Sequence, residues 1–398
     1  MVRKIAATYI FPGNQPPIKN GILTCTSDGT ILEISGNNEK ITEKSGLEYY
    51  SGILVPGFVN THCHLELSHL KGKIEEKTGI GGFIGKINQL RNQETENVEK
   101  AIQVADRIMW AAGTAAVGDI SNSALTIETK KNSKIFYHTF IESFGFHPLR
   151  AERAFDIAQF VQFQFKEWNL ANSIVPHSPY SVSKPLFEKL KENAIAEKSI
   201  LTIHNQESES ESEFYDKGTG AILNHLQNNL GIDTSHWQPT GKSSLTSVLQ
   251  YLPTENQLLL VHNTFTTKKD LNELRKIRST ENTYFVLCPN SNLYIENRLP
   301  PVPLFREENL NICIGTDSLA SNHGLSVLAE MITLQLNFPE IKLDELVEWA
   351  TLSGSKALQI EDKYGSFEVG KKPGVNLISG IDFKTMKLTE KSKVKRLI

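Results

Sequence analysis

The sequence has few of the features that define several large protein classes. Its 398 residues include only four cysteines, too few for the disulfide framework of a small secreted protein. No apolar run approaches the ~20 residues that a membrane-spanning helix needs, and the opening segment is too short in its apolar part for a secretory signal. The 42 Lys and Arg nearly balance the 45 Asp and Glu, so the basic excess typical of nucleic-acid-binding proteins is missing. We therefore expect a cytoplasmic protein with free thiols that binds a small molecule and neither membranes nor nucleic acids.

The middle of the sequence alternates between short apolar runs rich in β-branched residues and longer stretches with helical periodicity. This alternation is typical of parallel strands that helices cover on both faces. The strand-like runs are 53–61, 114–120, 134–141, 172–176, 199–203, 257–261, 283–287 and 311–315, and the clearest helical stretches are 98–112, 152–168, 185–197 and 268–277. Eight such units predict a (β/α)₈ TIM barrel over residues 53–365. An open doubly wound sheet is the alternative, but no glycine-rich turn follows the first run.

The two ends of the sequence have a different pattern. Residues 1–52 and 366–398 contain short strand-like runs broken by Gly, Pro and Asn, without a convincing helix. We expect them to form one small composite β-sandwich domain, although two unrelated tails are the alternative. A third segment, 208–247, follows the fifth strand-like run and opens with acidic residues. It is long enough to hold a helix and cover a pocket as a lid, although its acidic start also fits a solvated loop.

Residue types that bind metals follow several of the predicted strands, which is where TIM barrels carry their chemistry. His62 and His64 follow the first run, and alternate residues of an extended segment point the same way, so both imidazoles can face one centre. The fourth, fifth, sixth and eighth runs are followed by His177, His204, His262 and Asp317. Imidazole and carboxylate ligands together favour Zn²⁺, and less specifically Fe²⁺, Mn²⁺ or Co²⁺.

Glu207 lies three residues after His204. A carboxylate beside a metal site that is not needed as a ligand can move protons to and from water. Each residue also has a simpler explanation when taken alone. His177 could be a hydrogen-bonded structural residue, Asp317 could cap the segment that follows it, and Glu207 could begin a solvated loop. Their joint occurrence at successive strand ends favours a metal site with catalytic groups beside it.

The motifs around these residues resemble the amidohydrolase superfamily. They are VPGFVNTHCH (55–64), HNQE (204–207), VHN (261–263), CPNSN (288–292) and GTDSLASN (315–322). They are most similar to its aromatic-amine deaminase branch, which includes deaminases for guanine, S-adenosylhomocysteine and aminodeoxyfutalosine. The resemblance covers nearly the whole chain. A branch with two metals bridged by a carboxylated lysine is disfavoured, because the fourth run ends at His177 with no lysine there.

The resemblance implies one divalent metal, zinc in first place and iron as the alternative, with His62, His64, His204 and Asp317 as its ligands. Glu207 would then be the proton shuttle, His262 would hydrogen-bond the metal-activated water, and Asp317 would help protonate departing ammonia. The implied reaction is hydrolytic deamination of an amino-purine nucleoside by metal-hydroxide attack. The resemblance alone also suggests a homodimer.

The resemblance also implies that His177 reaches the substrate and not the metal. Four further residues are predicted to contact the substrate: Glu66, Arg150, Arg153 and Trp237. The two arginines could bind a substrate carboxylate, and the long segment that carries Trp237 suggests a ligand larger than a free base. Glu66 and the arginine pair also fit surface roles. The favoured substrate is aminodeoxyfutalosine, followed by S-adenosylhomocysteine or an adenosine-type nucleoside. Guanine deamination, amide or halide hydrolysis on the same site, and a non-catalytic binding barrel are the alternatives.

Overall fold

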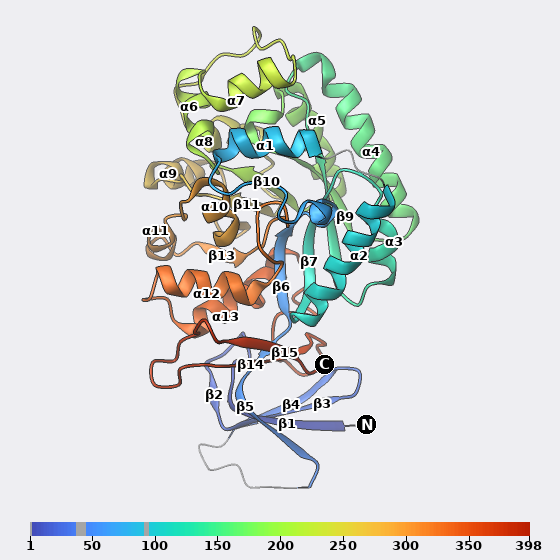
Figure 1. The fold of residues 1–398 in the computed structure, drawn as a ribbon, viewed down its shortest axis with the longest axis vertical. Helices are drawn as coiled ribbons and strands as arrows, with labels where there is room; N and C mark the ends of the chain where they lie inside the picture. Colours follow the sequence, from blue (N-terminus) through green and yellow to red (C-terminus); the bar gives the residue numbers. More distant parts are fainter. Residues whose placement is uncertain (1, 37–44, 91–94) are drawn as a thin grey trace.

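A computed structural model describes residues 2–36, 45–90 and 95–398. Its strands fall into two groups, which Figure 1 shows at opposite ends of the longest axis. One group is a sheet built from both ends of the chain, near the two termini. The other comprises parallel strands surrounded by helices and belongs to the middle of the chain.

In the described residues, the sheet near the termini has seven strands in the order β15-β14-β5-β1-β3-β4, with β2 paired to β1. Their bounds are Val2–Ile10 (β1), Ile18–Lys19 (β2), Gly21–Thr26 (β3), Ile31–Gly36 (β4), Leu47–Pro56 (β5), Val375–Ser379 (β14) and Lys393–Arg396 (β15). Strand β5 is parallel to β1 and antiparallel to β14, so it joins the two ends of the chain. Buried residues from both ends, including Ile5, Leu23, Leu54 and Val375, form one apolar cluster.

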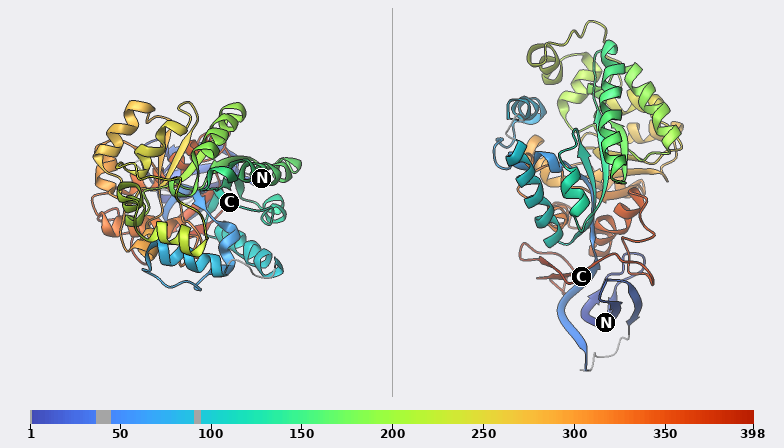
Figure 2. Two further views of the ribbon diagram at one scale, coloured as in Figure 1. Left: turned by 90° about the horizontal axis from the view of Figure 1, so that it is seen from above. Right: turned by 90° about the vertical axis from the view of Figure 1, so that its right-hand side faces the viewer.

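Within the described ranges, the middle of the chain forms two four-stranded parallel sheets, β6-β7-β8-β9 and β10-β11-β12-β13. Their bounds are Phe58–Cys63 (β6), Thr114–Ser121 (β7), Phe136–Ser143 (β8), Asn172–Pro176 (β9), Leu201–Asn205 (β10), Leu258–His262 (β11), Thr283–Leu287 (β12) and Asn311–Ile314 (β13). Almost every residue in these strands is buried, because helices surround them (Figure 2). This confirms the predicted α/β class with parallel strands.

The first predicted run differs from the structure. Residues 53–61 are not one strand, because β5 ends at Pro56 in the sheet near the termini and β6 begins at Phe58. The break falls at Gly57, where a Cβ atom would lie 2.3 Å from the carbonyl oxygen of Pro373. Only glycine permits that approach. The apolar pattern continues through this break and therefore hides it, whereas the other seven runs match strands to within two residues.

The helices cover the strands and one end of the two parallel sheets. Their bounds are Gly79–Leu90 (α1), Thr95–Ala111 (α2), Ile127–Asn132 (α3), Ala151–Glu167 (α4), Lys184–Glu197 (α5), Glu209–Lys217 (α6), Ala221–Asn224 (α7), Ser244–Val248 (α8), Lys268–Ile277 (α9), Pro289–Glu296 (α10), Val302–Glu307 (α11), Val327–Asn337 (α12), Leu343–Ala350 (α13) and Leu352–Ala357 (α14). Short helical turns are Leu65–Leu70 (η1), Pro148–Arg150 (η2), Pro179–Ser181 (η3), His225–Asn229 (η4) and Leu249–Tyr251 (η5). Helices α1 and α7 meet at the end of the sheets far from the termini, with Gly81 against Ala221 (Figure 1).

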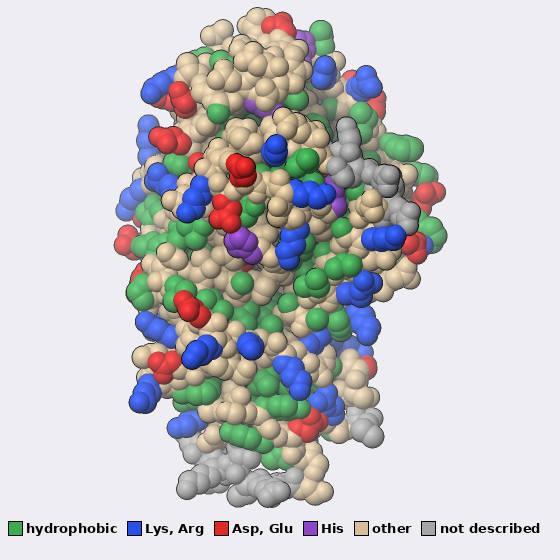
Figure 3. All heavy atoms as spheres, viewed as in Figure 1, with side chains coloured by type: hydrophobic (Ala, Val, Ile, Leu, Met, Phe, Trp, Pro, Cys, Tyr) green, Lys and Arg blue, Asp and Glu red, His purple; other side chains and the backbone are tan. Residues whose placement is uncertain are grey.

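The segment predicted as a lid, 208–247, contains α6, α7, η4 and most of α8. No helix in the described part of the chain is both long and apolar enough to cross a membrane. Acidic and basic side chains are interspersed over the face drawn in Figure 3. All four cysteines are buried, and their thiols are free.

A buried ion pair fixes the turn that follows β6. The Nζ atom of Lys130 lies 2.6 Å from Oδ2 of Asp119, and neither side chain is exposed to solvent. The other oxygen of Asp119 accepts a hydrogen bond of 2.8 Å from the backbone N–H of Leu65. Lys130 also donates to Thr139 Oγ1 at 2.9 Å. The pair therefore connects α3 to β7 and holds the start of η1.

Replacing Lys130 with methionine should lower the free energy of unfolding by about 3–5 kcal/mol, because the Asp119 carboxylate is left buried without its cation. Chemical denaturation measures this loss. The neighbouring Lys131→Met is the control, since Lys131 pairs with Glu128 at the surface and such pairs contribute ~1 kcal/mol or less. Equal, small losses in both variants would contradict the assigned importance of the buried pair.

Candidate active site

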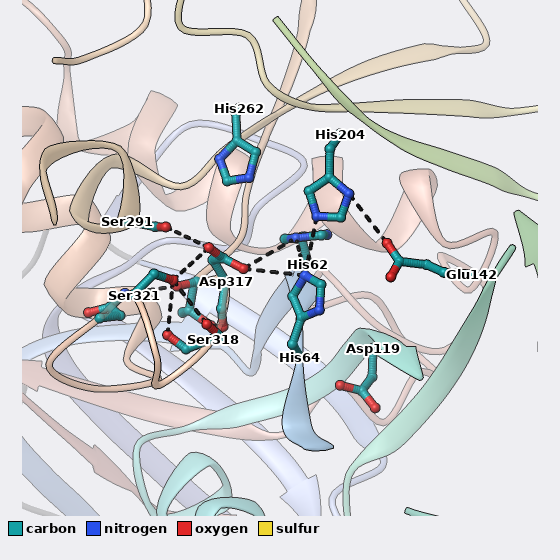
Figure 4. Close-up of polar contacts among 12 residues, drawn as sticks. His62, His64, Asp119, Glu142, His204, His262, Ser291, Asp317, Ser318 and Ser321 are labelled. Carbon is teal, nitrogen blue, oxygen red and sulfur yellow. Dashed lines mark hydrogen bonds and ion pairs between the residues drawn. The ribbon is translucent and has the colours of Figure 1, made fainter. Parts of the chain in front are cut away.

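Three imidazoles from two strands converge at one end of the parallel sheets. His62 and His64 come from the end of β6, and His204 comes from the end of β10 (Figure 4). The Nε2 atom of His64 lies 3.1 Å from Nε2 of His62 and 3.2 Å from Nε2 of His204. Oδ1 of Asp317, which follows β13, lies 3.4 Å from Nε2 of His64 and 3.6 Å from Nε2 of His62. The structure thus brings the four predicted ligands together.

The spacing of these atoms fits a tetrahedral metal ion. Four ligands placed 2.0–2.1 Å from a zinc ion are separated from each other by about 3.3 Å. The measured separations, from 3.1 to 3.6 Å, lie around that value. Burial lowers the pKa values of His62 and His64, so both rings are uncharged at neutral pH and have a lone pair to donate. The donor set therefore fits a divalent cation.

The carboxylate of Asp317 is oriented by two serine hydroxyls. Ser291 Oγ donates to Oδ2 at 2.5 Å, and Ser321 Oγ donates to the same atom at 2.6 Å. These bonds occupy Oδ2 and leave Oδ1 directed at the imidazoles (Figure 4). The backbone N–H of Asp317 donates to the carbonyl oxygen of His62 at 3.0 Å, which fixes the end of β6 against the residues after β13.

Glu207 is buried beside this cluster. The hydroxyl of Tyr180 donates to its Oε1, and its Oε2 lies 3.6 Å from Nε2 of His262. Burial raises the pKa of Glu207 to about 7, against the opposing effect of the Tyr180 hydrogen bond. The backbone N–H groups of Gln206 and Glu207 both donate to the Glu211 carboxylate at 3.0 Å, which fixes this turn after β10.

His262 and His177 lie on either side of His204. The ring centroid of His262 is 5.6 Å from that of His204, and the ring centroid of His177 is 4.9 Å from it. Burial lowers the pKa of His262 to about 3, so this ring is neutral. Nδ1 of His177 contacts the hydroxyls of Ser178 and Ser181 at 3.0 and 2.8 Å.

These residues border a cavity of about 430 Å³ that has a polar and an apolar wall. The polar wall includes Glu66, Asn122 and Glu142. The apolar wall consists mainly of side chains from α1 and from the segment 208–247, namely Phe83, Ile84, Ile87, Ile222, Leu226, Leu230 and Ile232. Its mixed polar and apolar lining is typical of small-molecule sites.

Only some of the residues predicted to contact the substrate line this cavity. His177, Glu66 and Arg150 line it, whereas Arg153 and Trp237 are not among the described residues that do. Trp237 stacks on Phe214 with ring centroids 3.9 Å apart, so its ring packs inside the covering segment. Arg153 is exposed on α4.

Tyr180, Asn122 and Glu142 also lie at the site, although no sequence pattern singled them out. Tyr180 follows His177 by three residues, just after the fourth predicted strand. Asn122 directly follows β7, and Glu142 lies near the end of β8. Inspecting the residues after the second and third predicted strands would therefore have found both. No sequence spacing marks these residues as part of a site, because the residues that they contact come from other strands.

Named relatives of this chain are deaminases. An adenosine deaminase of Helicobacter pylori is 28% identical over 360 residues, covering 88% of this chain and 85% of the relative. An aminodeoxyfutalosine deaminase of a Nitratiruptor species is 26% identical and covers 82% and 79%. A 5′-deoxyadenosine deaminase of Methanosarcina acetivorans is 25% identical and covers 89% and 78%.

Solved structures show the same fold. The crystal structure of Helicobacter pylori aminofutalosine deaminase in complex with methylthio-coformycin has a TM-score of 0.81 at 23% identity, with full coverage of both chains. An adenosine deaminase from Xanthomonas campestris with bound zinc has a TM-score of 0.73 at 19% identity and covers 97% of this chain and 87% of that one. Residues 53–398 match the amidohydrolase family. Because that match spans most of the sequence, the chain belongs to the amidohydrolase family.

Proposed function

We propose that this protein is a divalent-metal-dependent deaminase that hydrolyses the amino group of an adenine nucleoside. The observation that carries the proposal is the convergence of three imidazole nitrogens and the Asp317 carboxylate next to the buried Glu207 carboxyl group, at the edge of one cavity. The relatives named above support the reaction class, since each is named for deamination of an adenine-containing nucleoside.

The same proposal includes the scaffold of this site, which is a closed (β/α)₈ barrel over residues 53–365. Contacts between the two parallel sheets support closure on both sides. On one side, the backbone N–H of His204 donates to the carbonyl oxygen of His177 at 3.0 Å. On the other, Cys63 forms a parallel bridge with Asp317. Residues 1–52 and 366–398 would form the separate composite β domain. Because residues 53–56 belong to β5 of that sheet, the first strand of the barrel would be β6, after Gly57.

His62, His64, His204 and Asp317 are the residues that would hold the ion. Zinc is the expected metal because the donors are three imidazoles and a carboxylate, and because the Xanthomonas relative was solved with bound zinc. A divalent ion of this kind lowers the pKa of water and so supplies a nucleophile near neutral pH.

Glu207 is the proposed proton shuttle. With a pKa of about 7, its carboxyl group is present in both protonation states near neutral pH, as general acid–base catalysis requires. Tyr180 fixes Oε1 by donating to it, so Oε2 is the atom that exchanges the proton with the substrate ring nitrogen. His262 is neutral and 3.6 Å from Oε2, where it can hydrogen-bond the attacking oxygen. Asp317 would then help protonate ammonia as it leaves.

The cavity also limits the choice of substrate. Its volume of about 430 Å³ accommodates a ligand larger than a free purine base. Arg150 is the cationic residue among the described residues that line it, and guanidinium binds carboxylate in bidentate fashion. Apolar side chains from α1 and the segment 208–247 cover the rest of the ligand. We therefore keep aminodeoxyfutalosine as the first substrate, with S-adenosylhomocysteine and adenosine-type nucleosides next.

Elemental analysis of purified protein should find about one equivalent of divalent metal per chain, and His64→Ala should lose it, because His64 Nε2 contacts two other ligand nitrogens. His323→Ala is the control, since this imidazole is 80% exposed and pairs with Glu76. Full metal content and activity in His64→Ala would remove His64 from the site.

Glu207→Gln should keep its metal and its fold but lose ~10²–10⁴-fold in kcat, the contribution typical of a general acid–base group. Steady-state ammonia release measures the loss. Glu209→Gln, two residues further along and exposed, should retain nearly wild-type turnover. A Glu207→Gln enzyme within tenfold of the wild-type rate would contradict the shuttle role.

Arg150→Met should raise KM for aminodeoxyfutalosine and S-adenosylhomocysteine about tenfold, because one charge-assisted contact to the carboxylate is lost. KM for adenosine, which has no carboxylate, should change little. Arg153→Met is the matched control and should leave all three values near wild type. Loss of adenine-type absorbance is the readout, and a clear preference for guanine would overturn this choice of substrate.

A further inference from the structure

His204 has polar partners on both of its ring nitrogens. Its Nδ1 lies 2.8 Å from the carbonyl oxygen of His177 and 3.3 Å from Oε1 of Glu142 (Figure 4). A carbonyl oxygen can only accept a hydrogen bond, so Nδ1 carries the proton. The lone pair is then on Nε2, the atom that lies 3.2 Å from Nε2 of His64. The ring is therefore in the tautomer that a metal ligand needs.

The carboxylate of Glu142 is itself held in place. Glu142 lies near the end of β8 and is 7% exposed. The side-chain amide of Asn122 donates to its Oε2 at 3.4 Å and to Oε1 of Glu66 at 2.9 Å. The backbone N–H of Asn122 also donates to Glu66, at 3.0 Å. Glu66 thus fixes Asn122, and Asn122 orients Glu142 with one oxygen toward His204.

We propose that Glu142 is a positioning residue that acts through the Nδ1–H of His204. Its carboxylate, 3.3 Å from Nδ1, reinforces the tautomer that the His177 carbonyl sets and makes Nε2 a stronger donor to the metal. Carboxylate partners of metal-bound histidines act in this way, and their removal typically costs 10–100-fold in metal affinity. The inference rests on the proposed function, because it assumes that His204 binds the ion.

A second ion is the competing explanation of the same geometry, since ligand atoms of Glu142, His177 and His204 lie within 4.8 Å of one another. The protonated Nδ1 argues against it. That atom has no lone pair left for a cation, and Nε2 is directed at the first cluster. Glu142 therefore serves the first metal site instead of forming another.

The test measures zinc affinity by competition with a chelator at one fixed pH, using full-length protein. Glu142→Leu should weaken zinc binding 10–100-fold, and Glu142→Gln should weaken it less, because its amide oxygen keeps a polar atom close to Nδ1 of His204. Glu209→Gln is the control. It removes a carboxylate charge from an exposed position at the start of α6, outside the Glu66–Asn122–Glu142 chain, so zinc affinity should stay near wild type.

Thermal unfolding separates positioning from a general structural role. If Glu142 positions His204, the zinc-loaded Glu142 variants should have a lower Tm than zinc-loaded wild type. The metal-free variants should unfold at a Tm close to that of metal-free wild type. Unchanged zinc affinity in both Glu142 variants, a Tm loss confined to the metal-free form, or a second metal equivalent that disappears with Glu142→Leu would overturn the proposal. If wild type bound no metal, the proposed function would fail as well. If wild type binds zinc and the Glu142 variants bind it equally well, only the proposed role of Glu142 fails.

Discussion

The convergence of three imidazoles and one carboxylate at a single point is the constraint on which the rest of the structure depends. The four residues come from the ends of β6, β10 and β13, and Asp317 follows His62 by more than 250 residues. Parallel strands bring such distant residues together because their carboxyl ends share one side of the sheet. The backbone N–H groups of Thr316 and Asp317 both donate to the carbonyl oxygen of His62, so the ligands are fixed by the main chain as well as by side chains.

Buried carboxylates hold the turns that follow these strands. Backbone N–H groups in such turns lie outside the sheet ladders and need another acceptor. Asp119 accepts from Leu65 next to His64, Glu211 accepts from Glu207, and Glu330 accepts from Asn290 next to Ser291. Burial raises the pKa values of Glu211 and Glu330 to about 8, which shows how much solvation these groups give up. Buried acidic side chains therefore hold the turns that carry the proposed ligand His64, the proposed shuttle Glu207 and Ser291, which orients Asp317.

The sequence was informative where a residue type and its position in a strand carry the chemistry together. Histidines at strand ends predicted the cluster, and apolar runs predicted the parallel sheets. It was uninformative where partners are close only in space. Glu142 meets His204 across two strands, and no spacing links them. Trp237 was linked to the substrate by its place in a long segment, yet it packs on Phe214. The first run hid a change of sheet, because apolar residues lie directly on both sides of Gly57.

The backbone at the site shows why these side chains cannot be exchanged freely. His262, Asn263 and Asp317 have φ values of +74°, +56° and +58°, in the left-handed region that glycine enters at little cost. A bulky residue such as histidine is held there at a cost of about 1–3 kcal/mol unless the surrounding structure compensates. Glycine would relieve this strain at His262 but would remove the imidazole that lies 3.6 Å from Glu207. His262 lines the cavity in this conformation, so the backbone strain lies at a residue that the proposed function uses.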